Sequence, residues 1–320
     1  MLVNGQWDAA WHPVQGKDEK GGFIRNESQF RSQIGSEQYP AEAGRYHLYV
    51  ALICPWASRT LAVRALKGLE EIISISVVEP ILYDEGWSFG DLEGSTEDHI
   101  FHFKHLHQLY TKVESTYTGR VTVPVLFDKK TQTIVNNESS EIVRMLNSAF
   151  DHLLPKEKAD IDLYPKRLQA QIDALNDWMY PSINNGVYRV GFATTQVAYN
   201  EAITVLFSAL DALEKRLEKQ GPYLFGEELT ESDIRLFVTL IRFDVAYHGL
   251  FKANWQRIAD YPNLSSYTKR LFDLPDIRST VNIEHIKQGY YSVKALNPSQ
   301  IVPKGPASLF EPEYTTSFAS

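Results

Sequence analysis

The chain has 320 residues, 43% of them hydrophobic, and a formal net charge of -8 at pH 7. This length favours two domains, each with its own core. The acidic balance, without a run of lysine or arginine, argues against binding to nucleic-acid phosphates. No stretch reaches the roughly 18 apolar residues of a transmembrane helix, and the polar first residues lack the apolar segment of a secretory signal. We therefore expect a cytoplasmic protein that binds neither nucleic acid nor membranes.

The first half of the chain alternates strand and helix signals. A β-prone run precedes a segment with apolar residues along one helical face, and a second β-branched run follows. Two more strands then flank a polar turn, and a helical segment comes last. These segments are 46–52, 57–67, 72–78, 122–128, 133–136 and 142–149. A β-α-β unit followed by β-β-α predicts a thioredoxin-like α/β domain with helices covering a small mixed sheet.

The sequence pattern of the second half of the chain predicts helices and no strands. From residue 163 to about 286, apolar residues recur at helical spacing, as at Val205, Ala209 and Leu213. Residues 151–165 are charged and contain two prolines, which suits a linker. The expected organisation is an arm at 1–45, a thioredoxin-like domain at 46–150 with an insertion at 79–119, the linker at 151–165, an all-α domain at 166–290 and a tail at 291–320.

Cys54 is the single cysteine, which excludes an intrachain disulfide and argues against a cysteine-based zinc site. It stands at a strand-to-helix turn, so we expect Cys54 at the helix N-cap and Pro55 at the first helical position. Unpaired N–H groups and the helix dipole stabilise a thiolate there and lower the cysteine pKa from its ordinary ~8.5. Because position 57 is alanine, no resolving cysteine follows, and an oxidised Cys54 needs an external thiol such as glutathione. A buried, inert cysteine is the alternative.

The pair Val123-Pro124 opens the third predicted strand. A proline at the start of a strand in a thioredoxin-like sheet is the expected place for a cis peptide bond. The backbone N–H and C=O of Val123 can then pair with an extended tripeptide lying beside Cys54, as in strand addition. An edge-strand proline with a trans bond is the alternative.

Glu138 and Ser139 stand at the start of the helix predicted over 142–149. The free N–H groups of a helix N-terminus and the serine hydroxyl suit a carboxylate, whereas Glu138 suits an ammonium group. A γ-glutamyl group carries both charges. An ordinary helix cap is the alternative.

We interpret two further motifs as structural features without a role in catalysis. Thr230 and Asp233 precede an apolar run and predict a variant capping box. Histidines occur at 99, 102, 105 and 107, but they lack the i, i+4 pair of a helical zinc site. We interpret them as a polar helical face and expect no metal site.

Taken together, the Cys-Pro-Trp-Ala turn at 54–57, the Val-Pro pair, the Glu-Ser pair and the Thr-x-x-Asp box resemble omega- and xi-type glutathione transferases. Longer strings at 41–48, 119–126 and 183–193 are similar to glutathionyl-hydroquinone reductases. The resemblance runs from about residue 22 to 306. It implies the glutathione transferase fold, an α/β thioredoxin-like N-terminal domain followed by an all-α C-terminal domain, and a homodimer.

The resemblance also implies an activity, the removal of glutathione from glutathionyl-hydroquinones. Cys54 would attack the glutathione sulfur and form a mixed disulfide, and a second glutathione would release GSSG. Tyr188 corresponds to the acid/base tyrosine of the family, and Tyr247 and Tyr290 match tyrosines that line the hydroquinone pocket. The positions that match glutathione contacts are Trp87, Arg120, Val121, Thr122, Val123, Glu138 and Ser139.

The chain departs from the family pattern at three positions. Ser58 stands where a histidine is expected, and Gly289 and Val293 lie in a segment where relatives carry histidines.

Two other functions stay open at this point. One is a broader omega-like thiol transferase or dehydroascorbate reductase, against which the three matching tyrosines and the long insertion argue. The other is a noncatalytic interaction module, which would have no reason to retain both a helix-capping cysteine and a glutathione subsite.

Overall fold

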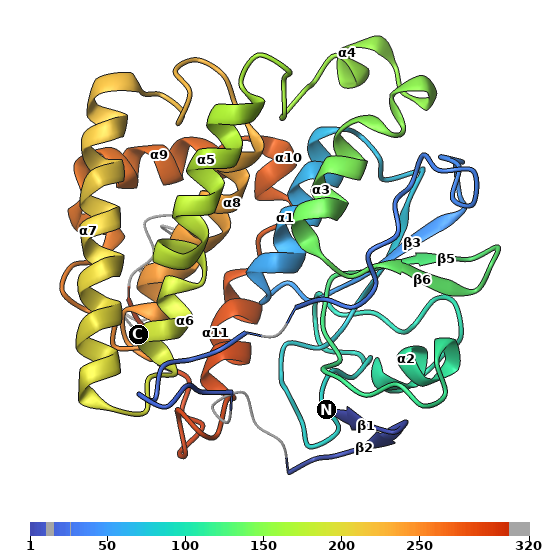
Figure 1. The fold of residues 1–320 in the computed structure, drawn as a ribbon, viewed down its shortest axis with the longest axis horizontal. Coiled ribbons are helices and arrows are strands. Elements are labelled where there is room, and N and C mark those ends of the chain that lie inside the picture. The colour runs from blue at the N-terminus through green and yellow to red at the C-terminus, as the bar shows by residue number, and fades with distance from the viewer. Residues whose placement is uncertain (11–15, 26, 307–320) are drawn as a thin grey trace, which may run out of the picture. The chain divides into compact units, whose positions relative to one another are not determined.

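The computed structural model describes residues 1–10, 16–25 and 27–306 (Figure 1). The chain forms two compact units. The first unit contains 1–12, 26–162 and 279–289, and the second contains 13–25, 163–278 and 290–320. The longest segment of the first unit ends at Asp162, and each unit is described by itself below.

A four-stranded mixed sheet is the centre of the first unit. Its strands are β3 (Tyr46–Val50), β4 (Ser74–Val77), β5 (Val125–Asp128) and β6 (Thr133–Asn136), in the order β4-β3-β5-β6. β3 runs parallel to β4 and antiparallel to β5, and β5 runs antiparallel to β6. This is the thioredoxin-like sheet that the sequence predicts, although β4 and β5 are shorter than the predicted runs 72–78 and 122–128.

Two helices pack together beside this sheet, α1 (Pro55–Leu66) and α3 (Ser139–Ser148) (Figure 1). Ten residues of α1 are buried, and several of them are small, which lets the helix lie close to its neighbours. On α3 the apolar positions Ile142, Met145 and Leu146 share one buried face, as the sequence spacing predicts.

A buried ion pair joins the start of β3 to the end of β5. The Arg45 guanidinium donates through Nε and Nη2 to the two carboxylate oxygens of Asp128, at 2.9 and 2.6 Å. Such a bidentate pair is strong and directional. It therefore helps to hold the register in which Tyr46 lies opposite Asp128.

The rest of the first unit consists of short elements. They are β1 (Leu2–Val3), β2 (Gln6–Trp7), α2 (His107–Val113), the 3-10 turn η2 (Asp151–Leu153) and α4 (Lys156–Ala159). The predicted polar helical face of histidines is wrong. Helix α2 begins only at His107, and the other three histidines lie in the loop before it.

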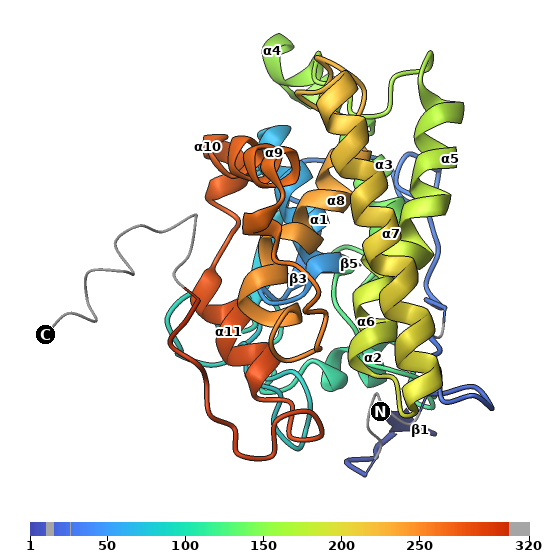
Figure 2. The same cartoon turned by 90° about the vertical axis from the view of Figure 1, so that its left-hand side faces the viewer.

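The second unit is helical, as predicted. Its elements are α5 (Gln169–Met179), the π-helical turn η3 (Tyr180–Asn184), α6 (Gly186–Gly191), α7 (Gln196–Gln220), α8 (Glu231–Arg242), the π-helical turn η4 (Phe243–Tyr247), the 3-10 turn η5 (Ile258–Asp260), α9 (Pro262–Phe272) and α10 (Pro275–Arg278). α7 is the long helix that packs against α6 and α9 (Figures 1 and 2). α11 (Ile283–Tyr291) contributes its last two residues to this unit. In the described part of the chain, no helix has both the length and the apolar character needed to cross a membrane.

The capping box predicted at Thr230 and Asp233 is confirmed at the start of α8. One Asp233 carboxylate oxygen accepts from the Thr230 N–H and hydroxyl, at 2.8 and 2.9 Å. The other oxygen accepts from the Leu224 N–H at 2.9 Å and from the Tyr267 hydroxyl at 3.0 Å. Asp233 thus ties three segments of the second unit together.

We expect Asp233→Ala to lower the free energy of unfolding by roughly 2–4 kcal/mol, because it removes a cap and leaves buried donors unpaired. Thr195→Ala is the control, since Thr195 caps α7 at the surface through one N–H, that of Ala198. Its expected loss is about 1 kcal/mol. Urea unfolding followed by circular dichroism compares the two variants. Equal losses would contradict a special role for Asp233.

Candidate active site

Cys54 occupies the position that its sequence context predicts. It is the N-cap of α1, with Pro55 as the first helical residue, and the thiol-bearing residue is partly exposed. The Cys54 N–H donates to the Ala51 carbonyl at 3.0 Å, and the Cys54 carbonyl accepts from the Ser58 N–H at 2.9 Å. These bonds fix the turn so that the side chain lies at the positive end of the helix dipole, where a thiolate is stabilised.

The start of β5 lies beside this thiol. Cys54 Sγ is 3.6 Å from the carbonyl oxygen of Val123, and the predicted cis bond between Val123 and Pro124 is confirmed. The neighbouring Thr122 carbonyl accepts from the Tyr110 hydroxyl at 2.9 Å. Tyr110 is buried, which raises its pKa, and its hydroxyl also accepts from the Asn137 side chain at 3.3 Å. Tyr110 therefore links the strand beside Cys54 to the segment that leads into α3.

Glu138 and Ser139 begin α3, as predicted, with Glu138 as the N-cap. Glu138 Oε1 accepts from the N–H and the hydroxyl of Ser140, at 3.0 and 2.8 Å, and Oε2 accepts from Ser28 at 3.2 Å. The structure thus shows the capping role that the sequence left as an alternative. A carboxylate has about four acceptor positions, so capping does not prevent Glu138 from accepting a ligand ammonium group.

Sequence reasoning missed Arg59, a buried side chain of α1. Its guanidinium lies 4.5 Å from the ring centroid of Trp56, and Nη1 lies 3.5 Å from Ser139 Oγ. A fixed positive charge next to the start of α3 strengthens an anion site there. One signal was available: Arg59 follows the cysteine turn by one helical turn, on the face that packs towards α3.

The remaining residues predicted to contact glutathione lie in two loops of the first unit. The Trp87 carbonyl accepts from the Leu106 N–H at 2.9 Å, and the Arg120 carbonyl accepts from the Tyr117 hydroxyl at 3.1 Å. Val121 follows Arg120 and, like it, is partly exposed. These loops are therefore anchored through their backbones.

The three predicted tyrosines meet in the second unit. Tyr290 lies in the middle, with its hydroxyl oxygen 2.6 Å from that of Tyr188 and 2.8 Å from that of Tyr247. Phe251 packs against all three rings, at centroid distances of 5.1 to 5.6 Å. We call Tyr188, Tyr247 and Tyr290 the tyrosine cluster.

Both hydroxyl–hydroxyl contacts are short enough to be hydrogen bonds, and either oxygen can be the donor in each. Tyr247 is 0% exposed and Tyr188 is 9% exposed, so Tyr188 is the more accessible of the two. The buried hydroxyls therefore find hydrogen-bond partners within the cluster.

Arg25, which sequence reasoning also missed, belongs to this unit. Its guanidinium carbon lies 4.8 Å from the centroid of the Tyr188 ring, and Nε donates to Asn185 Oδ1 at 2.9 Å. A cation over an aromatic ring favours negative charge on that ring. No motif surrounds Arg25 in the sequence.

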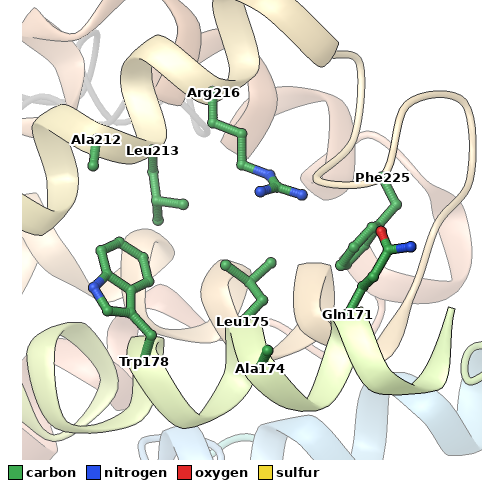
Figure 3. Close-up of a pocket in the computed structure, with 8 residues that line it drawn as sticks. All are labelled: Gln171, Ala174, Leu175, Trp178, Ala212, Leu213, Arg216 and Phe225. Carbon is green, nitrogen blue, oxygen red and sulfur yellow. The ribbon is translucent and has the colours of Figure 1, made fainter.

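A cavity of about 500 Å³ also occurs in the second unit (Figure 3). It is lined by side chains of α5 and α7 and by Phe225, with Trp178 and Leu175 facing Leu213 across it. None of the predicted catalytic or glutathione-binding residues lines this cavity. It is therefore not the candidate site.

The departures from the family pattern have partial explanations. A Cβ on Gly289 would lie 2.4 Å from Ile53 Cδ1 and 2.6 Å from the Pro80 carbonyl oxygen, so no side chain fits at this position without a shift. Ser58 is buried in α1, where a larger histidine would displace its neighbours. Nothing in the structure explains Val293.

Comparison with known proteins identifies the family. Residues 53–149 match the model of the glutathione S-transferase N-terminal domain, and residues 196–270 match that of the C-terminal domain. The chain therefore belongs to the glutathione transferase family, within its xi-class and glutathionyl-hydroquinone reductase branch.

Three relatives show this placement. Glutathionyl-hydroquinone reductase PcpF of Sphingobium chlorophenolicum is 49% identical, with 96% of each chain covered. A crystal structure of the xi transferase of Phanerochaete chrysosporium has a TM-score of 0.89 at 51% identity and covers 91% of this chain and 94% of that one. The glutathione-bound structure of YqjG from Escherichia coli has a TM-score of 0.87 at 44% identity and covers 97% and 96%.

The tyrosine cluster predicts a pH dependence of stability. Burial raises the pKa of Tyr247 and of Tyr290 well above the ordinary value of 10.0. The folded state therefore holds these protons at pH values where the unfolded chain loses them. Their contribution to stability is fully present below pH 10.0 and is lost as the pH rises above it.

Unfolding free energies measured from about pH 9 to 11 test this, since the slope should be smaller in Tyr290→Phe than in wild type. Tyr83→Phe is the control, because Tyr83 is exposed and lies outside the cluster. An unchanged slope in Tyr290→Phe would show that the cluster does not bind these protons in the folded state.

Proposed function

We propose that this protein reduces glutathionyl-hydroquinones to hydroquinones with glutathione as the reductant. The Cys54 thiolate attacks the glutathionyl sulfur, the carbon–sulfur bond breaks, and the ring carbon takes the electron pair and a proton. The products are the hydroquinone and a Cys54-glutathione disulfide. A glutathione thiolate then attacks this disulfide and releases GSSG and the Cys54 thiolate. Overall the ring carbon is reduced by two electrons, and the thioether sulfur of the substrate and the thiol sulfur of the second glutathione are oxidised to the disulfide of GSSG.

One observation carries the proposal. Cys54 caps α1 with its sulfur 3.6 Å from the Val123 carbonyl, in a chain about half identical to a glutathionyl-hydroquinone reductase. The dipole of α1 supports the thiolate, and the main chain at Val123 supports an extended peptide beside it. A glutathione transferase that activates bound glutathione with serine or tyrosine would have no need of a cysteine here.

We propose that glutathione binds through the seven positions that match the family. The N–H groups at the start of α3 and the Ser139 hydroxyl receive the γ-glutamyl carboxylate, with Arg59 adding positive charge. Glu138 pairs with the γ-glutamyl ammonium group. Val123 pairs with the peptide backbone, and Trp87, Arg120, Val121 and Thr122 complete the subsite.

We propose Tyr188 as the proton donor to the ring carbon. Two observations support this role: the Tyr188 hydroxyl oxygen lies 2.6 Å from that of Tyr290, and the Tyr188 side chain is more exposed than that of Tyr247. Transfer of the hydroxyl proton leaves negative charge on Tyr188, which the hydroxyl of Tyr290 and the guanidinium of Arg25 stabilise. Tyr247 and Tyr290 also offer aromatic surface to a quinol ring.

We also propose a homodimer, as the family resemblance implies, and the cytoplasmic location expected from the sequence. Light scattering on the purified protein measures the oligomeric state directly.

The first test removes the nucleophile. Wild type, Cys54→Ala and Cys54→Ser are incubated with glutathione and a glutathionyl-hydroquinone, and hydroquinone and GSSG are quantified. Both variants should lose turnover by at least ~10³-fold, since no other thiol is present. Circular dichroism checks that they fold. Turnover at the wild-type rate in either variant would overturn the mechanism.

The second test separates the proposed reaction from a general thiol transferase. Tyr188→Phe should slow release of hydroquinone by ~10²–10⁴-fold, the usual contribution of a general acid. Reduction of a simple mixed disulfide needs no proton on carbon and should change little. Tyr199→Phe is the control, because its hydroxyl bonds the Lys252 carbonyl, away from the tyrosine cluster. Equal losses in both reactions would show that Tyr188 contributes to packing and is not the proton donor.

A further inference from the structure

Three side chains of the insertion come together outside the proposed active site. Glu85, His105 and His107 each offer one ligand atom, and these atoms lie within 4.8 Å of one another. Glu85 lies in the loop after β4, whereas the two histidines flank Leu106 at the start of α2. The spacing of the histidines alone gave no sign of this arrangement, because the third residue lies twenty positions earlier in the chain.

The two imidazole rings lie parallel to each other. Leu106 is buried, and the rings of His105 and His107 stack with centroids 5.3 Å apart and planes 3° from parallel. His105 Nε2 lies 2.7 Å from Glu85 Oε2. The Glu85 side chain is 56% exposed, so the group opens to solvent on its carboxylate side.

One nitrogen of this group lacks a partner. His107 Nε2 is buried and has no hydrogen-bond partner among the described residues. A buried ring nitrogen without a partner is costly, so this atom points to a missing ligand. The pairing of His105 with Glu85 does not explain it.

Trp7 packs against His107 in the same group. Its indole stacks on His107, at a centroid distance of 5.0 Å, and its Nε1 donates to the Asp84 carbonyl at 2.8 Å. The ring also packs against Gly86, where a Cβ would lie 2.7 Å away. His107 is therefore held between Trp7 and His105, which limits its rotation and lowers the entropy cost of binding a ligand.

We propose that Glu85, His105 and His107 form a binding site for a divalent transition-metal ion of the zinc type. Two imidazoles and one carboxylate are a frequent ligand set for zinc, with solvent in the fourth position. Tetrahedral ligands at ordinary zinc distances lie about 3.3 Å apart. The exposed Glu85 side chain can move to reach this spacing.

Metal binding at this site would restrain the neighbouring loop that carries Trp87. Trp87 follows Glu85 by two residues, and its carbonyl accepts from the N–H of Leu106, which stands between the two histidines. A metal bound to all three ligands therefore fixes the main chain on both sides of Trp87. A resulting effect on glutathione affinity rests on the proposed role of Trp87, whereas metal binding itself does not.

The test measures zinc binding directly, without activity. The full-length Cys54→Ser protein, which has no thiol to bind zinc, is stripped with a chelator and titrated with Zn²⁺ in competition with a chromophoric chelator. We expect one bound ion per chain. Adding His107→Ala or Glu85→Gln should weaken the affinity by at least ~10-fold, since even second-shell changes cost 10–100-fold.

His102→Gln in the same background is the matched control, because His102 pairs with Glu97 at the surface without a second histidine. It should leave zinc affinity unchanged. Glu85 is exposed, so Glu85→Gln gives a result even if His107→Ala fails to fold. The proposal is wrong if the Cys54→Ser protein binds no zinc, or if Glu85→Gln binds zinc as tightly as His102→Gln does.

Discussion

The first unit depends on one constraint, the short turn that ends β3 at Val50 and starts α1 at Pro55. Because so few residues connect the buried strand to the helix, Cys54 has to occupy the N-cap, where unpaired N–H groups and the helix dipole act on its sulfur. The same sheet brings the start of β5 next to this turn, and α3 packs on α1, so that Val123, Ser139 and Arg59 collect around one helix end. The arrangement needs no metal or second cysteine to stabilise negative charge on sulfur.

The second unit differs from the first because it holds phenolic hydroxyl groups in an apolar interior. Tyr247 and Tyr290 are buried deeply enough that ionisation is unfavourable, which keeps them as hydrogen-bond donors at neutral pH. Hydrogen bonds within the cluster join the Tyr290 hydroxyl to those of Tyr188 and Tyr247, so these buried oxygens have partners. Tyr188, at 9% exposure, is more accessible than Tyr247, at 0%.

Many features of the fold and of the candidate site were predictable from the sequence, namely those that depend on residues close together in the chain. The β-α-β and β-β-α order, the N-cap position of Cys54, the cis bond before Pro124 and the capping box at Thr230 all follow from neighbouring residues and were confirmed. The histidines were misinterpreted, because their spacing was judged as if they shared one helix, whereas α2 begins at His107. Tyr110, Arg59 and Arg25 were missed because each acts through a residue far away in the chain.

The sequence by itself determined the fold class, the nucleophile candidate and, by resemblance, the tyrosines that accompany it. Those features depend on short-range rules of strand, turn and helix formation, and on strings of residues that identify a family. Only the tertiary structure decided that Glu138 caps α3, that Tyr290 bridges two other tyrosines, and that Glu85 meets His105 and His107. These contacts join residues that are brought together by packing, and no local pattern encodes the direction in which a distant side chain will point.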